Sequence, residues 1–156
     1  ALPTLKKDFH VHPAQILEAR AVGASAVLLI ARALAPDRLR QLAGVASDLA
    51  LDVLVEVRSE AELDDALGIE AAVIGVNSRD LETLIIEPTV AGRLIPMIPA
   101  DRVAIAESGV GERRDVERAA AWGADAVLVG SSISASADPA AAVASLTGVA
   151  RRSRGR

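Results

Sequence analysis

The chain has 156 residues, of which 51% are hydrophobic and 24% charged, a composition typical of a compact globular protein rather than a disordered segment. It has no cysteine, which excludes disulfides and thiolate chemistry, and its only aromatic residues are Phe9 and Trp122, which argues against a stacking platform for single-stranded nucleic acid. The formal net charge is −4 and becomes −8 without the four arginines of the last six residues, so the body of the protein should not attract DNA or RNA.

Short apolar runs alternate along the chain with longer stretches of helical periodicity, which predicts an α/β protein with a parallel sheet. The six predicted strands are approximately Thr4 to Phe9, Ala26 to Ala31, Val53 to Val57, Ala72 to Asn77, Val103 to Glu107 and Ala126 to Gly130. Helix starts are indicated at Pro13, Pro36, Ser59 with Glu62 as a capping box, Pro88, and Asp138 followed by Pro139. Helix ends are indicated at Gly23, Gly68 and Gly123, each suited to a left-handed closing residue.

An internal echo supports this division into units. Residues 23–30 read GASAVLLI, and residues 123–130 read GADAVLVG. In both segments a helix is expected to stop on glycine, turn through small or polar residues and enter a buried strand. The same local structure is therefore predicted twice, 100 residues apart.

The rest of the chain predicts one domain over residues 1–150 and a basic tail over residues 151–156. The tail RRSRGR is interpreted as a solvated, frayed terminus rather than an anchor for nucleic acid or a membrane surface. No apolar run approaches the roughly 18 residues of a membrane span, and the first residues lack the order of a signal peptide. We therefore expect a cytoplasmic protein with no membrane or nucleic-acid partner.

Polar side chains close several of the apolar strands, and parallel α/β proteins bind ligands at the carboxyl ends of their strands. Lys7, Glu56, Asn77 and Glu107 each lie near such an end. Together they could supply an acid, a base and a charge stabiliser for one substrate. Taken singly, each has a structural alternative: a salt-bridged carboxylate, or a solvated lysine pair at Lys6 and Lys7. Two glutamates within apolar strands favour a site, because a buried charge without partners costs several kcal/mol.

Glycine-bearing turns follow the last two predicted strands, at residues 108–111 (SGVG) and 130–132 (GSS). Their backbone N–H groups, approachable at the glycines, are typical of a phosphate cradle, and this is the position where many barrel enzymes bind phosphate. Taken singly, each turn could equally be a tight turn and nothing more. A dinucleotide fingerprint is excluded because Arg114 occupies the place of its third glycine.

The sequence offers little support for metal or serine chemistry. His10 and His12 are the only histidines, and no further cluster at ligand spacing completes a metal shell, so we expect no metal site. The sequence contains no G-x-S-x-G motif, the turn that exposes a nucleophilic serine in α/β-hydrolases.

Taken in order, these motifs resemble the indole-3-glycerol phosphate synthase family. The resemblance covers essentially the whole chain and rests on KDF at residues 7–9, AVLLIA at 26–31, VEV at 55–57, IGVNSRDL at 74–81, AESGV at 106–110 and VLVGSS at 127–132. It implies a TIM-barrel-like fold of βα repeats, with this chain matching the third to eighth units of an eight-unit barrel. The first two units, with a glutamate and a second lysine that the family carries on its first strand, would then be absent.

The resemblance also implies a reaction. Members of the family are carboxy-lyases of tryptophan biosynthesis that convert 1-(2-carboxyphenylamino)-1-deoxyribulose 5-phosphate to indole-3-glycerol phosphate, releasing carbon dioxide and water without a metal or cofactor. By this resemblance Lys7 is the general acid and Glu56 handles protons in the dehydration, while Asn77 and Glu107 position the substrate and stabilise the developing iminium charge. Phe9 would pack on the anthranilate ring, Arg79 and Ser108 would support the carboxylate end, and the phosphate would be held by Gly109, Gly130 and Ser131.

Two other hypotheses stay open at this point. A shortened barrel could bind phosphate without efficient turnover and complete itself by association, with itself or with a missing N-terminal segment, because exposed sheet edges invite pairing. A Schiff-base aldolase could use Lys7, since lysines at strand ends serve that chemistry in similar barrels.

Overall fold

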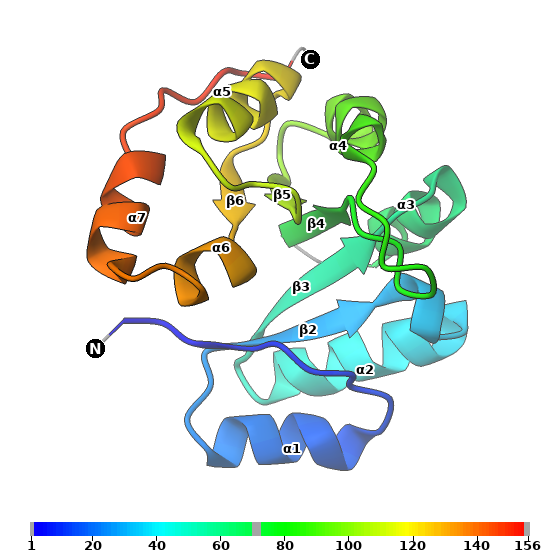
Figure 1. The fold of residues 1–156 in the computed structure, drawn as a ribbon. Coiled ribbons are helices and arrows are strands. Elements are labelled where there is room, and N and C mark those ends of the chain that lie inside the picture. Colours follow the sequence, from blue (N-terminus) through cyan, green and yellow to red (C-terminus); the bar gives the residue numbers. More distant parts are fainter. Residues whose placement is uncertain (1, 70–72, 155–156) are drawn as a thin grey trace. The chain divides into compact units, whose positions relative to one another are not determined.

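The computed structural model describes residues 2–69 and 73–154 and consists of strands that alternate with helices (Figure 1). The strands are β1 (Leu5–Lys6), β2 (Ala26–Ile30), β3 (Asp52–Val57), β4 (Val73–Asn77), β5 (Val103–Glu107) and β6 (Ala126–Leu128). The helices are α1 (Pro13–Ala21), α2 (Pro36–Asp48), α3 (Glu60–Leu67), α4 (Pro88–Leu94), α5 (Arg113–Trp122), α6 (Ser131–Ser134) and α7 (Pro139–Leu146), with short 3-10 turns η1 (Ala31–Ala33) and η2 (Ile95–Met97). Within the described ranges, no helix is long and apolar enough to cross a membrane.

The chain divides into two compact units, residues 1–74 and 75–156. In the first unit β1, β2 and β3 run parallel in that order, with Ala26 of β2 opposite both Leu5 and Asp52. The strands β2 and β3 have mostly buried side chains, as expected where a parallel strand is covered on both faces. Helices α1 and α2 pack against each other and against β2 (Figure 1), and their buried positions are Ile16, Ala19, Leu39, Leu42 and Ala46.

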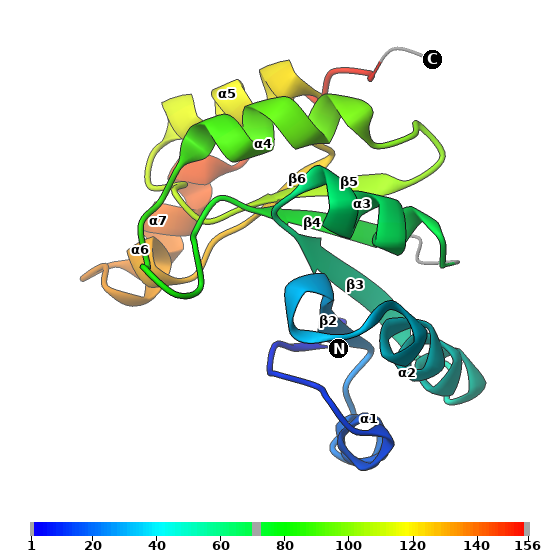
Figure 2. The same ribbon diagram turned by 90° about the vertical axis from the view of Figure 1, so that its right-hand side faces the viewer.

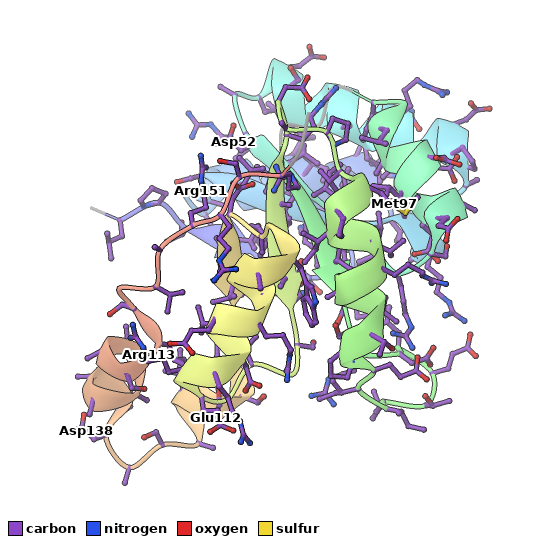
Figure 3. All side chains as sticks on the ribbon, turned by 90° about the horizontal axis from the view of Figure 1, so that it is seen from above. Asp52, Met97, Glu112, Arg113, Asp138 and Arg151 are labelled. Carbon is purple, nitrogen blue, oxygen red and sulfur yellow. The ribbon has the colours of Figure 1, made fainter. Side chains whose placement is uncertain are left out.

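The second unit begins within β4, at Gly75, and repeats the pattern with β5 and β6. The strands β5 and β6 are parallel, with Ile105 opposite Ala126, and the Ser78 N–H just after β4 donates to the Glu107 carbonyl at 3.0 Å. Helices α4 and α5 lie side by side (Figure 2), and a Cβ on Gly92 of α4 would come within 3.0 Å of the Trp122 ring of α5. Figure 3 shows Glu112 and Arg113 at the start of α5; Arg113 also donates to the Thr147 carbonyl just after α7. The alternation of parallel strands and helices confirms the predicted α/β, TIM-barrel-like class, with six βα units.

All six predicted strands are present, but the first and last are shorter than predicted. The first was expected to reach Phe9, yet β1 ends at Lys6, because the side chains of Asp8 and Gln15 bind the Phe9 backbone in place of ladder hydrogen bonds. The last was expected to reach Gly130, but β6 ends at Leu128. Of the fourth predicted strand, Ala72 lies outside the described residues.

The internal echo is confirmed in the hydrogen bonds. The N–H groups of Ala24 and Ala124 donate to the carbonyls of Ala19 and Ala119, both at 3.0 Å. The helix ends themselves carry glycines with positive φ, 86° at Gly23 and 95° at Gly123. At Gly68 the prediction of a left-handed residue is wrong, because α3 ends there with φ of −73°.

The predicted helix starts at Pro13, Pro36, Pro88 and Pro139 are confirmed, and the Ser59 hydroxyl accepts from the Glu62 N–H as expected. The other half of the predicted capping box differs, because the Glu62 carboxylate accepts a hydrogen bond from the Arg58 N–H at 2.7 Å. The start of α5 was not predicted. It is capped by Glu112 and Asp115, a pair that departs from the usual serine and glutamate signature.

The C-terminal residues differ from the predicted frayed tail. The Arg154 side chain is only 4% exposed, and its guanidinium donates to Asp125 and to the carbonyls of Ile98 and Gly123. Arg151 forms a second ion pair with Asp125 at 2.9 Å. These arginines therefore fasten residues 151–154 to the rest of the second unit, because the five donors of a guanidinium group match the cluster of acceptors there. The single-domain organisation over residues 1–150 remains a prediction.

Candidate functional site

The first unit brings together Lys7 and Glu56, two of the predicted catalytic residues. Glu56 lies in β3 and is 3% exposed, whereas the Lys7 side chain directly after β1 is 45% exposed. The Lys7 Nζ lies 3.0 Å from the Glu56 Oε2 across 49 residues of sequence. The chain therefore holds a partly accessible ammonium group against a buried carboxylate.

The two neighbouring lysines differ in their contacts, because Lys6 and Lys7 have different partners. The Lys6 Nζ contacts Glu18 of α1 at 3.0 Å and Asp8 at 3.6 Å. The hydrogen bond to Glu18 is the largest influence that raises the pKa of Lys6. The hydrogen bond from the Phe9 N–H is the largest influence that lowers the pKa of Asp8. Lys6 is thus tied to α1, and Lys7 alone is paired with the strand-end glutamate.

Phe9 and the two histidines follow on the same loop. Phe9 is 57% exposed, so its ring is available for contact. His10 is buried, and its Nδ1 lies 2.9 Å from the Leu28 carbonyl, while its Nε2 has no hydrogen-bond partner within the described residues. The His12 Nδ1 accepts from the Ala14 N–H and caps α1. Both histidines therefore have structural roles, and the described residues contain no group of three or more metal-ligating side chains.

The second unit brings together Asn77, Arg79 and Ser108. The Asn77 Oδ1 accepts two hydrogen bonds, from the Arg79 N–H at 2.9 Å and from the Ser108 hydroxyl at 2.8 Å. Asn77 is 6% exposed and Glu107, at the end of β5, is 2% exposed. The ends of β4 and β5 thus present a buried amide and a buried carboxyl group, joined by the backbone bond from Ser78 to Glu107.

Arg79 begins a loop that folds back on itself before α4. Arg79 forms an antiparallel bridge with Ile86, and its guanidinium donates to the Leu84 carbonyl at 3.1 Å. The Asp80 side chain accepts from two further N–H groups of the loop, those of Glu82 and Thr83. The segment from residue 78 to residue 87 is therefore internally braced.

The two glycine-bearing turns lie next to each other. The Ser132 hydroxyl of the second turn donates to the Val110 carbonyl of the first at 3.0 Å. Gly109 has φ of 73°, and a Cβ there would lie 2.8 Å from the Ile86 side chain, so only glycine fits without strain. A Cβ on Gly130 would meet nothing within 4 Å, and Ser131 is exposed at the start of α6.

One part of the predicted cradle is not available. The Gly111 N–H donates to the Asp115 carboxylate at 2.9 Å, and so does the Glu112 N–H at 3.2 Å. Burial acts to raise the pKa of Asp115, but these two hydrogen bonds and nearby arginines outweigh it and lower the pKa. The Gly111 amide therefore caps α5 and does not point to a ligand.

Sequence reasoning missed the contact between Asn77 and Ser108 and the burial of Ser78, which is 2% exposed. An asparagine that ends a strand commonly accepts an N–H two residues further on, so the Arg79 bond had a local signal. The bond to Ser108 spans 31 residues and had none.

Comparison with known proteins gives consistent matches. A family model described as "Indole-3-glycerol phosphate synthase" matches residues 1–146. A protein of that name from Nocardioides sp. is 48% identical over 147 residues, which is 94% of this chain and 56% of that protein. One from Dehalococcoides mccartyi is 46% identical over 140 residues, covering 90% of this chain and 54% of that protein. The chain thus spans about half the length of the curated relatives it matches.

Solved structures with similar folds are much more distant in sequence. FabK from Thermotoga maritima matches with a TM-score of 0.66 and 16% identity, over 86% of this chain and 43% of that one. A mandelate oxidase mutant matches with a TM-score of 0.66 and 15% identity, over 82% of this chain and 48% of that one. These likenesses concern the fold alone.

Proposed function

The chain belongs to the indole-3-glycerol phosphate synthase family, and from this premise we propose that the protein takes part in the ring closure that gives the family its name. The substrate would be 1-(2-carboxyphenylamino)-1-deoxyribulose 5-phosphate, and the reaction would release carbon dioxide and water. This is carboxy-lyase chemistry in tryptophan biosynthesis. A cytoplasmic location stays a prediction from the sequence.

The contact between Lys7 and Glu56 carries the proposal. An ammonium group held 3.0 Å from a buried carboxylate is a positioned proton donor, which suits Lys7 to protonate the substrate carbonyl oxygen as the ring closes. Glu56 would then handle the proton that leaves in the dehydration step. The same contact disfavours the Schiff-base aldolase alternative, because an ammonium group in an ion pair is not a nucleophile.

The second unit would contribute fixed electrostatics. Glu107 is buried at the end of β5, where a carboxylate would stabilise the positive charge that develops on the iminium intermediate. Asn77 would orient the substrate from the end of β4. Both roles depend on groups that do not reorganise during the reaction, which their burial supports.

The remaining predicted contacts concern substrate binding. The exposed ring of Phe9 suits the anthranilate ring, and the braced Arg79 suits the carboxylate, with Ser108 beside it. Gly109, Gly130 and Ser131 would hold the phosphate, which the hydrogen bond between the two turns and the open space at Gly130 support.

Replacement of Lys7 tests the reaction most directly. In the intact protein that contains this chain, Lys7→Ala should lower kcat for the ribulose phosphate substrate by at least about 100-fold, the range of a lost general acid. Lys6→Ala is the matched control, because it removes a neighbouring lysine that is tied to Glu18 and should leave kcat within about twofold. Full activity of Lys7→Ala would refute the assignment.

The second candidate is a phosphate-binding, catalytically impaired chain that associates with a second copy or with further βα units. The exposure of the last strand and helix favours this candidate. No residue of β6 is buried, and Leu146 is the only buried residue of α7. Val143 of α7 is 44% exposed, so this end of the second unit has apolar surface that a further chain segment could cover. It predicts a dimer or larger species in sedimentation without measurable turnover. A monomer that turns over the substrate would reject it.

A further inference from the structure

Ser108 has a backbone conformation that needs an explanation. Its φ is 63°, in the left-handed region, and the next residue, Gly109, has φ of 73°. For a residue with a Cβ this conformation is strained, because the Cβ comes close to the backbone. Such strain persists only where surrounding interactions hold it, and it is concentrated at functional sites. From this conformation the Ser108 hydroxyl donates to Asn77.

The chemistry of that bond fixes the orientation of the Asn77 carboxamide. The Arg79 backbone N–H can only donate, so the Asn77 atom that it contacts at 2.9 Å must be the oxygen. The Ser108 hydroxyl contacts the same oxygen at 2.8 Å and must donate as well. A flipped amide would place its NH2 group against the Arg79 N–H, which can only donate, and this excludes the flipped orientation.

Two consequences follow for a bound substrate. An amide oxygen has two lone pairs, and Arg79 and Ser108 use both, so any hydrogen bond from Asn77 to a substrate is donated by Nδ2. The Ser108 hydroxyl has one proton, which it gives to Asn77. It therefore has none to give to a substrate carboxylate, which accepts hydrogen bonds and cannot supply one.

We propose that Ser108 is a positioning residue, whose strained backbone aims its hydroxyl at the Asn77 oxygen and so holds the Asn77 carboxamide in one orientation. The inference rests on the proposed function and deepens it. It changes the role of Ser108 from a contact with the carboxylate end of the substrate to a group that acts through Asn77. The left-handed turn sets the direction, and the Arg79 N–H holds the same oxygen from the other side.

A double-mutant cycle separates the two roles. In the intact protein, Ser108→Ala and Ser108→Gly should each lower kcat by about 10- to 100-fold with KM within about twofold, the loss expected of a misplaced reacting group. The glycine variant matters because it removes the hydroxyl while it relieves the left-handed strain. Ser108→Ala added to Asn77→Ala should change kcat by less than about twofold, because residues that act through one group are not additive.

The opposite pattern would overturn the proposal. Losses that add in the double variant, or a raised KM with unchanged kcat, would mean that Ser108 contacts the substrate directly. Ser145→Ala is the matched control, because it also removes a hydroxyl bonded to a carbonyl, that of Ala142 in α7, and it should leave kcat and KM unchanged.

A spectroscopic measurement tests the positioning without turnover. Asn77 is the only asparagine of this chain, so 15N-asparagine labelling, with Asn77→Ala for assignment, identifies its side-chain amide. Hydrogen bonds to the amide oxygen slow rotation about the C–N bond, so Ser108→Ala should speed this rotation several-fold. An unchanged rotation rate would overturn the proposal. If the parent protein shows no turnover but the rotation rate changes, the proposed function fails and the positioning role stands.

Discussion

The Arg154 Nη1 lies 2.7 Å from the Asp125 Oδ2, across 29 residues, and joins the end of the chain to the residue that precedes β6. Asp125 also accepts from the Ala104 N–H at 2.8 Å, and Arg154 donates to the carbonyls of Ile98 and Gly123. The Arg154 side chain occupies the space at Gly123 so closely that a Cβ there would lie 2.5 Å from its Cγ. Arg154 and Asp125 therefore close one end of the second unit.

Removing Arg154 should be strongly destabilising. Arg154→Ala leaves the largely buried Asp125 without one of its partners, and we expect the free energy of unfolding to fall by about 3 kcal/mol. Urea denaturation of the intact protein measures this. Arg152→Ala, at an exposed neighbouring position, is the control and should change the free energy by less than about 0.5 kcal/mol. Equal effects of the two variants would contradict the anchoring role of Arg154.

The stability carried by Asp125 should depend on pH. Burial acts to raise the pKa of Asp125, but the Ala104 N–H, Arg154 and Arg151 outweigh it and hold the pKa below the ordinary 3.8. Because the folded pKa is the lower one, the ionised group stabilises the fold above the unfolded pKa, and this contribution is lost as pH falls through the folded value.

The variant Asp125→Asn isolates this contribution. It should be less stable than the parent at pH 7, and the difference should narrow as the pH falls below about 4. Urea titrations at a series of pH values test this. A difference that stays constant down to pH 3 would show that the charge of Asp125 contributes nothing.

The turn at Gly109 should not tolerate a side chain. Gly109→Ala imposes a left-handed φ on alanine and places its Cβ 2.8 Å from Ile86, so we expect a loss of about 2 kcal/mol. Gly44→Ala in α2 is the matched control with the opposite sign. Its Cβ would meet nothing within 4 Å, and alanine is favoured over glycine in a helix by about 0.5–1 kcal/mol. A stabilising effect at residue 109 would refute the strain argument.

The contact between α4 and α5 should depend on Gly92. A Cβ at that position would lie 3.0–3.2 Å from the Trp122 ring, so Gly92→Ala forces the helices apart and should cost about 1 kcal/mol despite the helix propensity of alanine. Gly92→Ala combined with Trp122→Leu should recover part of that loss, because the smaller side chain leaves room. Thermal unfolding of the two single variants and the double variant measures this recovery. Stability losses that simply add in the double variant would contradict the predicted contact.

The sequence by itself determined the order of elements and their chemistry. The spacing of apolar residues and the positions of proline and glycine are local properties of the sequence. They therefore sufficed to predict the six strands, the helix starts at proline and the repeated turn at Gly23 and Gly123. The wrong or missing predictions of helix ends also concern local structure. Gly68 ends a helix without the left-handed conformation, and α5 begins with a capping pair, Glu112 and Asp115, that has no common signature.

Only the tertiary structure decided which side chains meet. Lys7 and Glu56 are 49 residues apart, Asn77 and Ser108 are 31 apart, and Arg154 and Asp125 are 29 apart. No sequence pattern encodes such distances, because they depend on strand register and on how each loop leaves the sheet. For the same reason the tail was predicted to be solvated, although the Arg154 side chain is only 4% exposed: a charged residue is predicted to be exposed until its partners are known.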